Sequence, residues 1–210
     1  MVLRTARLIF WDFDGVIKES VDVKTNAYCR LFEPFGQEVV ERVRVHHEAY
    51  GGMSRFDKIP LYLRWAGQDP SDTKIREFCD QFSRQVVQGV IDASWVPGVE
   101  RYLRANTYGQ TFILVSATPH DELHYILEKL DLKRCFSEVH GAPEKKKDVI
   151  RNVISACCLD VRHCLMIGDA TADQQAADFN NVPFLLRKHN SNAHLFPAGT
   201  CCSIDDFIDL

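Results

Sequence analysis

The sequence predicts an α/β protein, built on a parallel sheet of about five strands with an inserted α-helical block. Short continuous apolar runs, typical of strands buried on both faces, recur along the chain. From residue 93 onward they alternate with helical patterns, as right-handed parallel crossovers require. Between the first two runs lies a mostly helical stretch that is longer than a crossover needs.

The first expected strand covers 8–11 and runs directly into Asp12, and Asp14-Gly15 marks the turn that ends it. The pattern over 17–92 predicts a helical cap between two parts of a core, 1–16 and 93–210. The tail from 187 looks loop-rich as far as 202. The remaining strands are expected at 111–115, 136–140, 163–167 and 182–186. The helices are expected at 23–35, 38–50, 59–65, 72–90, 99–105, 118–130, 146–158 and 172–179.

The composition is that of an ordinary globular chain. Its 210 residues suit one domain, or one domain with a sizeable insertion, and 46% of them are hydrophobic. A net charge of -4 argues against a nucleic-acid surface. The 8 cysteines show no C-x-x-C spacing, which favours free thiols in a reducing compartment. We find no signal peptide and no membrane span, so we expect a cytoplasmic monomer or homodimer.

Polar residues follow three of the expected strands. Asp12 and Asp14 end the first, Ser116 ends the second, and Asp169 ends the fourth. The carboxyl ends of parallel strands meet at one edge of a sheet, where ligands bind. A lysine run at 145–147 opens the helix before the fourth strand. This set offers a nucleophile, carboxylates for a hard cation such as Mg²⁺, a hydroxyl and an ammonium, as phosphoryl transfer needs.

These segments, in this order from Leu8 to Asp173, resemble the four motifs of the haloacid dehalogenase-like superfamily, in its phosphatase branch. The resemblance implies a three-layer Rossmann-like core with a helical cap. It also implies a Mg²⁺-dependent phosphomonoester hydrolase that acts on a small phosphorylated metabolite. No nucleic-acid or membrane partner is expected.

The resemblance assigns the reacting groups. Asp12 matches the nucleophile, which becomes an aspartyl-phosphate, and Asp14 matches the general acid/base. Ser116 matches the hydroxyl that binds a phosphoryl oxygen. The backbone N–H groups of Phe13 and Ala117 are expected to bind the same phosphoryl group.

The resemblance also assigns the cation site. Asp169 matches a Mg²⁺ ligand, together with the carboxylate of Asp12 and the carbonyl oxygen of Asp14. Asp173 matches the residue that orients this shell. Lys146 matches the lysine that neutralises the nucleophile and the transferring group.

Two assignments leave alternatives open. Lys146 is favoured because the lysine of one motif variant falls three residues after a proline, with Lys147 second and Lys145 third. Arg55 or Lys58, at the end of a cap loop, could bind an anionic group on the leaving alcohol; the alternative is an ordinary surface charge.

Three functions compete at this point. The phosphatase leads, and a sugar phosphomutase with the same two aspartates is the alternative. A non-catalytic binding module is disfavoured because every motif residue is present. Asp14 argues against a dehalogenase, since a halide leaves without a proton.

Overall fold

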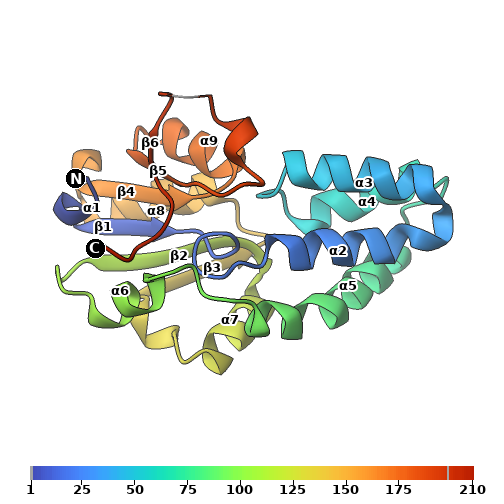
Figure 1. Ribbon diagram of the computed structural model, residues 1–210, viewed down its shortest axis with the longest axis horizontal. Helices are drawn as coiled ribbons and strands as arrows, with labels where there is room; N and C mark the ends of the chain where they lie inside the picture. The colour runs from blue at the N-terminus through green and yellow to red at the C-terminus, as the bar shows by residue number, and fades with distance from the viewer. Residues whose placement is uncertain (1, 198) are drawn as a thin grey trace.

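The computed structural model describes residues 2–197 and 199–210 and shows a six-stranded parallel sheet in the order β3-β2-β1-β4-β5-β6 (Figure 1). β1 lies at the centre, between β2 and β4. The chain moves outward from β1 to β3 and then crosses back to β4, so the strand order reverses beside β1. The strands are β1 (Leu8–Trp11), β2 (Thr111–Pro119), β3 (Glu138–Ala142), β4 (Cys164–Gly168), β5 (Phe184–Arg187) and β6 (Cys202–Ile204).

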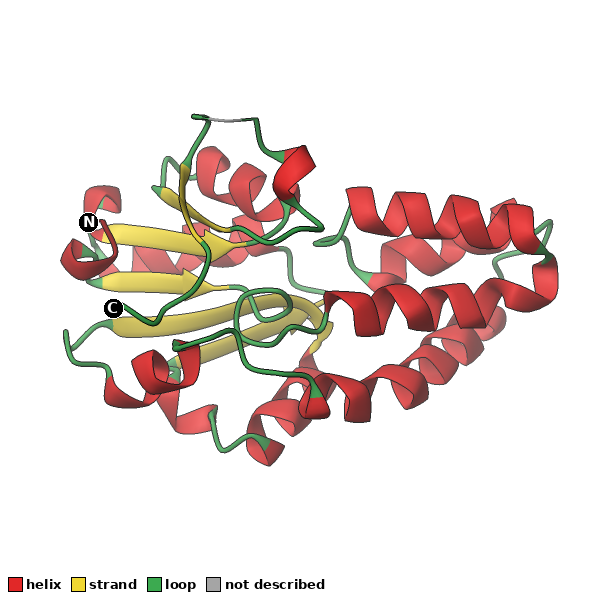
Figure 2. Ribbon diagram, in the orientation of Figure 1, coloured by secondary structure: helices red, strands yellow, loops and turns green. Residues whose placement is uncertain are grey.

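Helices cover both faces of this sheet, and a further group of helices lies beyond the carboxyl ends of its strands (Figure 2). The α-helices are α1 (Val2–Thr5), α2 (Val21–Phe32), α3 (Gln37–Ala49), α4 (Arg55–Trp65), α5 (Asp72–Asp92), α6 (Val99–Ala105), α7 (His120–Lys129), α8 (Lys146–Cys157) and α9 (Thr171–Phe179). The 3-10 helices are η1 (Glu33–Phe35), η2 (Lys133–Cys135), η3 (Val161–His163) and η4 (Ala193–Leu195). None of the helices in the described part of the chain is both long enough and apolar enough to cross a membrane.

The central strand is apolar throughout because both of its faces are covered. Ile9 and Trp11 pack into a core with α6 and α7. Leu8 and Phe10 point the other way and pack with α8 and α9. This alternation follows from the two-residue period of a strand, and it accounts for the uninterrupted apolar run before Asp12.

The predicted α/β class is confirmed, and the sheet has one strand more than the five expected. β6 is a three-residue strand that pairs in parallel with β5 at the edge of the sheet. Its sequence is short and partly exposed, so no apolar run marks it. The observed β3 and β5 begin two residues later than expected, and α4 begins at Arg55 because Ser54 accepts a hydrogen bond from the Phe56 N–H at 3.3 Å.

Helices α2 to α5 form a group beyond the carboxyl ends of the strands, which we call the helical insertion (Figure 1). Its interior is aromatic: Tyr28 and Phe82 lie 4.1 Å apart between ring centroids, and Tyr62 packs edge-on against Tyr28. The two segments that join the insertion to the sheet lie close together. Lys18, just before α2, donates from Nζ to the carbonyl of Ile91, near the end of α5, at 3.0 Å. The division of the chain into a core and a cap at 17–92 remains a prediction.

Candidate active site

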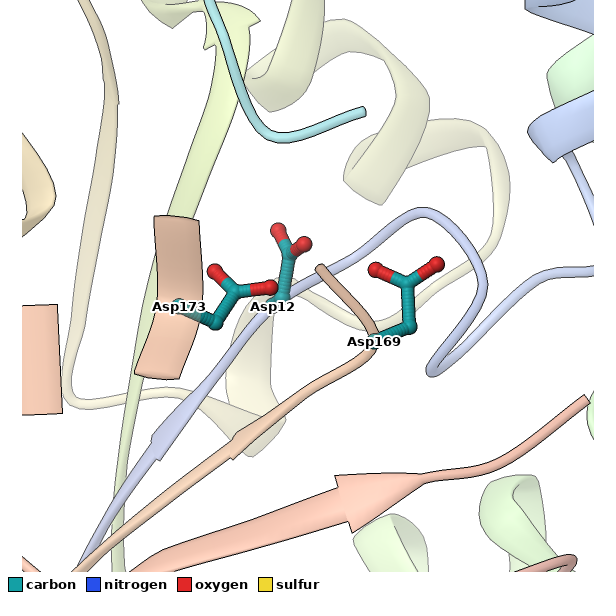
Figure 3. A group of neighbouring side chains, drawn as sticks. All are labelled: Asp12, Asp169 and Asp173. Atoms are coloured by element: carbon teal, nitrogen blue, oxygen red, sulfur yellow. The ribbon is translucent and has the colours of Figure 1, made fainter. Parts of the chain in front are cut away.

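Three carboxylates from separate segments meet at the carboxyl edge of the sheet (Figure 3). Asp12 follows β1, Asp169 follows β4, and Asp173 lies in the first turn of α9. An oxygen of each lies within 4.8 Å of the others, and all three residues are buried. The neighbouring positions of β1 and β4 explain this meeting, since Trp11 pairs with Ile167 and Asp12 N–H donates to the Ile167 carbonyl at 2.9 Å.

Lys146 is the lysine that the structure brings to this cluster. As the first residue of α8, it places Nζ 2.8 Å from Asp12 Oδ1 and donates to Asp173 Oδ1 at 2.6 Å. Lys145 and Lys147 are exposed, and Lys147 Nζ lies 5.1 Å from the centroid of the Phe179 ring. Among the lysines at 145–147, the geometry therefore favours Lys146 as the partner of the predicted nucleophile.

Burial makes the negative charges of this cluster costly. Burial, with the nearby charge of Asp173, raises the pKa of Asp12 to about 7, although Lys146 opposes the rise. Burial likewise raises the pKa of Asp169 and of Asp173. Burial alone would lower the pKa of Lys146, but Asp12 and Asp173 outweigh it and hold that pKa above its usual range.

The charges of the site fit a divalent cation. Its buried or half-buried carboxylates exceed its ammonium groups by two, and carboxylate oxygens are the donors that hard cations such as Mg²⁺ prefer. The carboxylates belong to Asp12, Asp14, Asp169 and Asp173, and the ammonium groups belong to Lys24 and Lys146.

Asp14 lies beside the cluster in a network of its own. Lys24 Nζ donates to Asp14 Oδ2 and, at 2.8 Å, to Thr118 Oγ1, while Ser20 Oγ donates to Asp14 Oδ1 at 2.6 Å. Burial opposes the charge of Asp14, but Lys24 and Ser20 hold the pKa of this carboxyl below its usual value. The structure therefore favours an ionised Asp14 in the absence of substrate.

Gly15 makes the turn after Asp14 sterically feasible. Its φ of 74° lies in the left-handed region, and a Cβ there would stand 2.2 Å from Asp169 Oδ2. The absence of a side chain lets the loop after β1 pass directly over the carboxylate that follows β4.

The other expected phosphate-binding groups also lie at this edge. Ser116 is buried near the end of β2, and its Oγ accepts the Thr118 N–H at 3.1 Å. Ala117 lines the cavity above Asp12. Phe13 is buried, and its carbonyl accepts the Ile17 N–H at 2.8 Å, which fixes the turn that carries Asp14.

Several residues of the site were not predicted from the sequence. His189 Nε2 lies 3.1 Å from Asp169 Oδ2, and Asn192 Nδ2 donates to the Asp169 carbonyl at 2.8 Å. Both lie after β5, in the tail that is predicted to be loop-rich. The feature of the sequence that could have predicted them is the cluster of polar residues directly after the fifth expected strand.

A cavity lies above these groups, between the sheet and the helical insertion. The insertion comes very close to α9 here: a Cβ on Gly52 would lie 2.8 Å from Ala172 Cβ. Arg55 lines the cavity but is buried, and its guanidinium binds Glu122. Arg55 is therefore not an ordinary surface charge, which was the alternative to substrate binding. Its role toward a substrate anion remains a prediction.

The fold and the site together define a doubly wound parallel α/β protein with an acidic centre at the switch point of its sheet. The model of the family described as haloacid dehalogenase-like hydrolase matches residues 9–186. The chain belongs to this family, and the predicted membership is confirmed. No curated protein sequence matches the chain.

Solved structures of low sequence identity share the fold. A CbbY variant from Rhodobacter sphaeroides in complex with xylulose-(1,5)bisphosphate is 15% identical, with a TM-score of 0.77 over 98% of this chain and 96% of that one. A β-phosphoglucomutase from Clostridium difficile is 16% identical, with a TM-score of 0.76 over 98% and 93%. A predicted phosphoglycolate phosphatase from Haemophilus somnus is 18% identical, with a TM-score of 0.72 over 98% and 96%.

Proposed function

We propose that this chain is a Mg²⁺-dependent phosphomonoester hydrolase that acts on a small phosphorylated metabolite through an aspartyl-phosphate on Asp12. One observation carries the proposal: Asp12 Oδ1 lies 2.8 Å from Lys146 Nζ, inside a buried cluster of carboxylates at the end of β1. A nucleophilic carboxylate needs this setting, because it must approach a phosphate dianion without prohibitive repulsion.

Asp12 would attack the phosphorus atom and displace the alcohol. Lys146 would hold Asp12 in place and offset the charge of the phosphoryl oxygens as they approach. The Ser116 hydroxyl and the backbone N–H groups of Phe13 and Ala117 would bind those oxygens. Water would then hydrolyse the phosphorylated Asp12 and release phosphate.

Asp14 would act in both halves of this cycle. It would protonate the leaving alcohol oxygen first and deprotonate the attacking water afterwards. The ion pair with Lys24 favours the ionised form that the second half needs. Protonation of the alcohol therefore requires this ion pair to weaken when substrate binds.

Asp12, Asp169 and the carbonyl oxygen of Asp14 would hold Mg²⁺, and Asp173 would orient this group of ligands. When bound, the ion would supply positive charge to the phosphoryl oxygens. His189 and Asn192 would fix the position of Asp169 through their contacts with its carboxylate and carbonyl.

The comparisons support a phosphorylated small molecule as the substrate class. The structural neighbours include a protein in complex with xylulose-(1,5)bisphosphate, a predicted phosphoglycolate phosphatase and a β-phosphoglucomutase. The location of the protein in the cytoplasm and its oligomeric state remain predictions.

The test is release of free phosphate from a panel of metabolites, with Mg²⁺ and with EDTA. We expect release that depends on Mg²⁺ and is absent in Asp12→Asn. Release that persists in that variant, or in EDTA, would contradict the proposal. Transfer of the phosphoryl group to a second hydroxyl, with no free phosphate, would identify a phosphomutase instead.

A further inference from the structure

The cavity above Asp12 offers little unpaired positive charge away from the reacting centre. Among the described residues that line it, the lysine and arginine side chains are Lys24 and Arg55, and both are in ion pairs. Arg55 Nη1 and Nη2 donate to the two oxygens of Glu122 at 2.9 and 2.6 Å, and Nη1 also donates to Ser83 Oγ at 2.5 Å. A protein carboxylate therefore already occupies the Nη1/Nη2 edge of the guanidinium, one of the two edges that can bind an anion through two hydrogen bonds.

Competition for Arg55 by a substrate would be unfavourable. The Arg55 and Glu122 side chains are only 3% and 9% exposed. A substrate anion that captured the guanidinium would leave Glu122 buried without a partner, which costs more than the pair itself contributes. The pair is neutral as a unit, so it exerts little attraction on a second phosphate or a carboxylate.

The neighbouring basic groups do not supply the missing charge. Lys24 is bound to Asp14 and Thr118 at the reacting centre, so the charge that it gains when its pair with Asp14 weakens faces the transferring phosphoryl group. Lys58 is buried behind the cavity wall, 2.7 Å from His47 Nδ1, and burial lowers its pKa well below the usual value. Burial also lowers the pKa of His47, so positive charge is disfavoured in this part of the insertion.

The rest of the lining is acidic or aromatic. Asp22 and Glu48 line the cavity with exposed carboxylates, and neither takes part in an ion pair among the described residues. Tyr28 and Phe82 form part of the wall contributed by the insertion. An anionic leaving group would therefore meet like charge at the rim and no free counter-charge within.

We propose that the leaving alcohol of the substrate carries no anionic group, neither a second phosphate nor a carboxylate. It is a neutral alcohol, such as the hydroxyl of a sugar or a nucleoside, that packs against Tyr28 and Phe82. This inference rests on the proposed phosphatase function and narrows it. It separates the chain from two of its structural neighbours, the protein bound to xylulose-(1,5)bisphosphate and the predicted phosphoglycolate phosphatase.

Matched substrate pairs test the proposal. Glycerol 2-phosphate and 2-phosphoglycerate differ by a hydroxymethyl group in place of a carboxylate, and fructose 6-phosphate differs from fructose 1,6-bisphosphate by one phosphate. We expect kcat/KM to be at least about tenfold higher for the member with the neutral leaving group. Equal or higher values for the anionic member would overturn this inference and leave the phosphatase assignment intact. No hydrolysis of any ester, p-nitrophenyl phosphate included, would overturn both.

Freeing Arg55 should weaken or abolish the preference. We expect Glu122→Gln to raise the ratio of bisphosphate to monophosphate kcat/KM at least about tenfold, because the guanidinium then lacks its counter-charge. Glu128→Gln, exposed on the same helix, is the control and should leave the ratio within about twofold of wild type. The ratio cancels differences in folded fraction between variants. An unchanged ratio in Glu122→Gln would overturn the role given to the ion pair.

A doubly neutral variant separates this proposal from direct binding of the substrate by Arg55. Arg55→Gln combined with Glu122→Gln removes both buried charges at once, and we expect the wild-type ratio within about threefold. A loss of bisphosphate hydrolysis of more than about tenfold, relative to the monophosphate, would show that Arg55 binds the second phosphate, and would overturn the proposal.

Discussion

Replacing Lys146 by methionine tests the charge balance on which the site depends. The substitution keeps an unbranched side chain as far as the ε position, and by deleting Nζ it removes two buried charge-assisted contacts, to Asp12 Oδ1 at 2.8 Å and to Asp173 Oδ1 at 2.6 Å. Removing one partner of a buried ion pair costs about 3–5 kcal/mol. We take the lower end, because Asp12, with a pKa of about 7, can accept a proton and so relieve part of the cost.

A loss of about 3 kcal/mol corresponds to a fall in Tm of about 6–12 °C for a chain of this size. We expect this loss in metal-free buffer above pH 7, measured by thermal and urea denaturation. The loss should shrink as the pH falls below about 7, because the native Asp12 then takes up a proton and no longer needs a counter-charge. Phosphatase kcat should fall by about 10²–10³, since a preorganised charge on the phosphoryl oxygens is gone.

Lys145→Met and Lys147→Met are the matched controls, because both side chains are exposed at the start of the same helix. Each should change the free energy of unfolding by less than about 0.5 kcal/mol. The reasoning is refuted if Lys146→Met keeps its stability and activity, or if either control loses as much.

Three further outcomes are expected. Gly15→Ala should lower the free energy of unfolding by about 3 kcal/mol in urea, because its Cβ would overlap Asp169 at a φ of 74°; Gly109→Ala, with a φ of 61° and open space, should cost only about 1 kcal/mol, and equal losses would contradict the overlap. Phe207→Ala should cost about 3–5 kcal/mol, since this ring is fully buried, whereas Ile208→Ala at 53% exposure should cost less than about 0.5 kcal/mol; similar losses would show that the C-terminal segment does not pack as described. Mg²⁺ at about 100 times its Kd should stabilise the protein by about 2.7 kcal/mol in a thermal melt, and an equal gain in Asp169→Asn would argue against the cation site.

The strand ends could be predicted because their signals are local. The apolar run before Asp12 and the run before Asp169 each belong to one short segment, and parallel crossovers bring the carboxyl ends of such strands to one edge. The convergence of Asp12, Asp169 and Asp173 follows from this topology, and the structure shows it. Their chemical roles remain predictions.

Other parts of the site depend on orientation, which the sequence does not specify. Successive residues on a helix point about 100° apart, so only one of the lysines at 145–147 can face the cluster, and the packing of α8 on the sheet selects Lys146. β6 was not expected, because a three-residue edge strand carries little apolar signal. His189 and Asn192 reach Asp169 only because the segment after β5 folds back over the carboxyl edge.

The sequence by itself determined the α/β class, the helical insertion after the first strand and the segments that carry acidic residues. It could do so because buried strands and half-buried helices leave different patterns of apolar residues along the chain. Only the tertiary structure decided which charges meet. The pairs Lys24–Asp14 and Arg55–Glu122 join residues 10 and 67 positions apart, and no local pattern encodes their distance. The net charge offered to a substrate is a sum over such contacts, so the character of the cavity is a property of the folded chain.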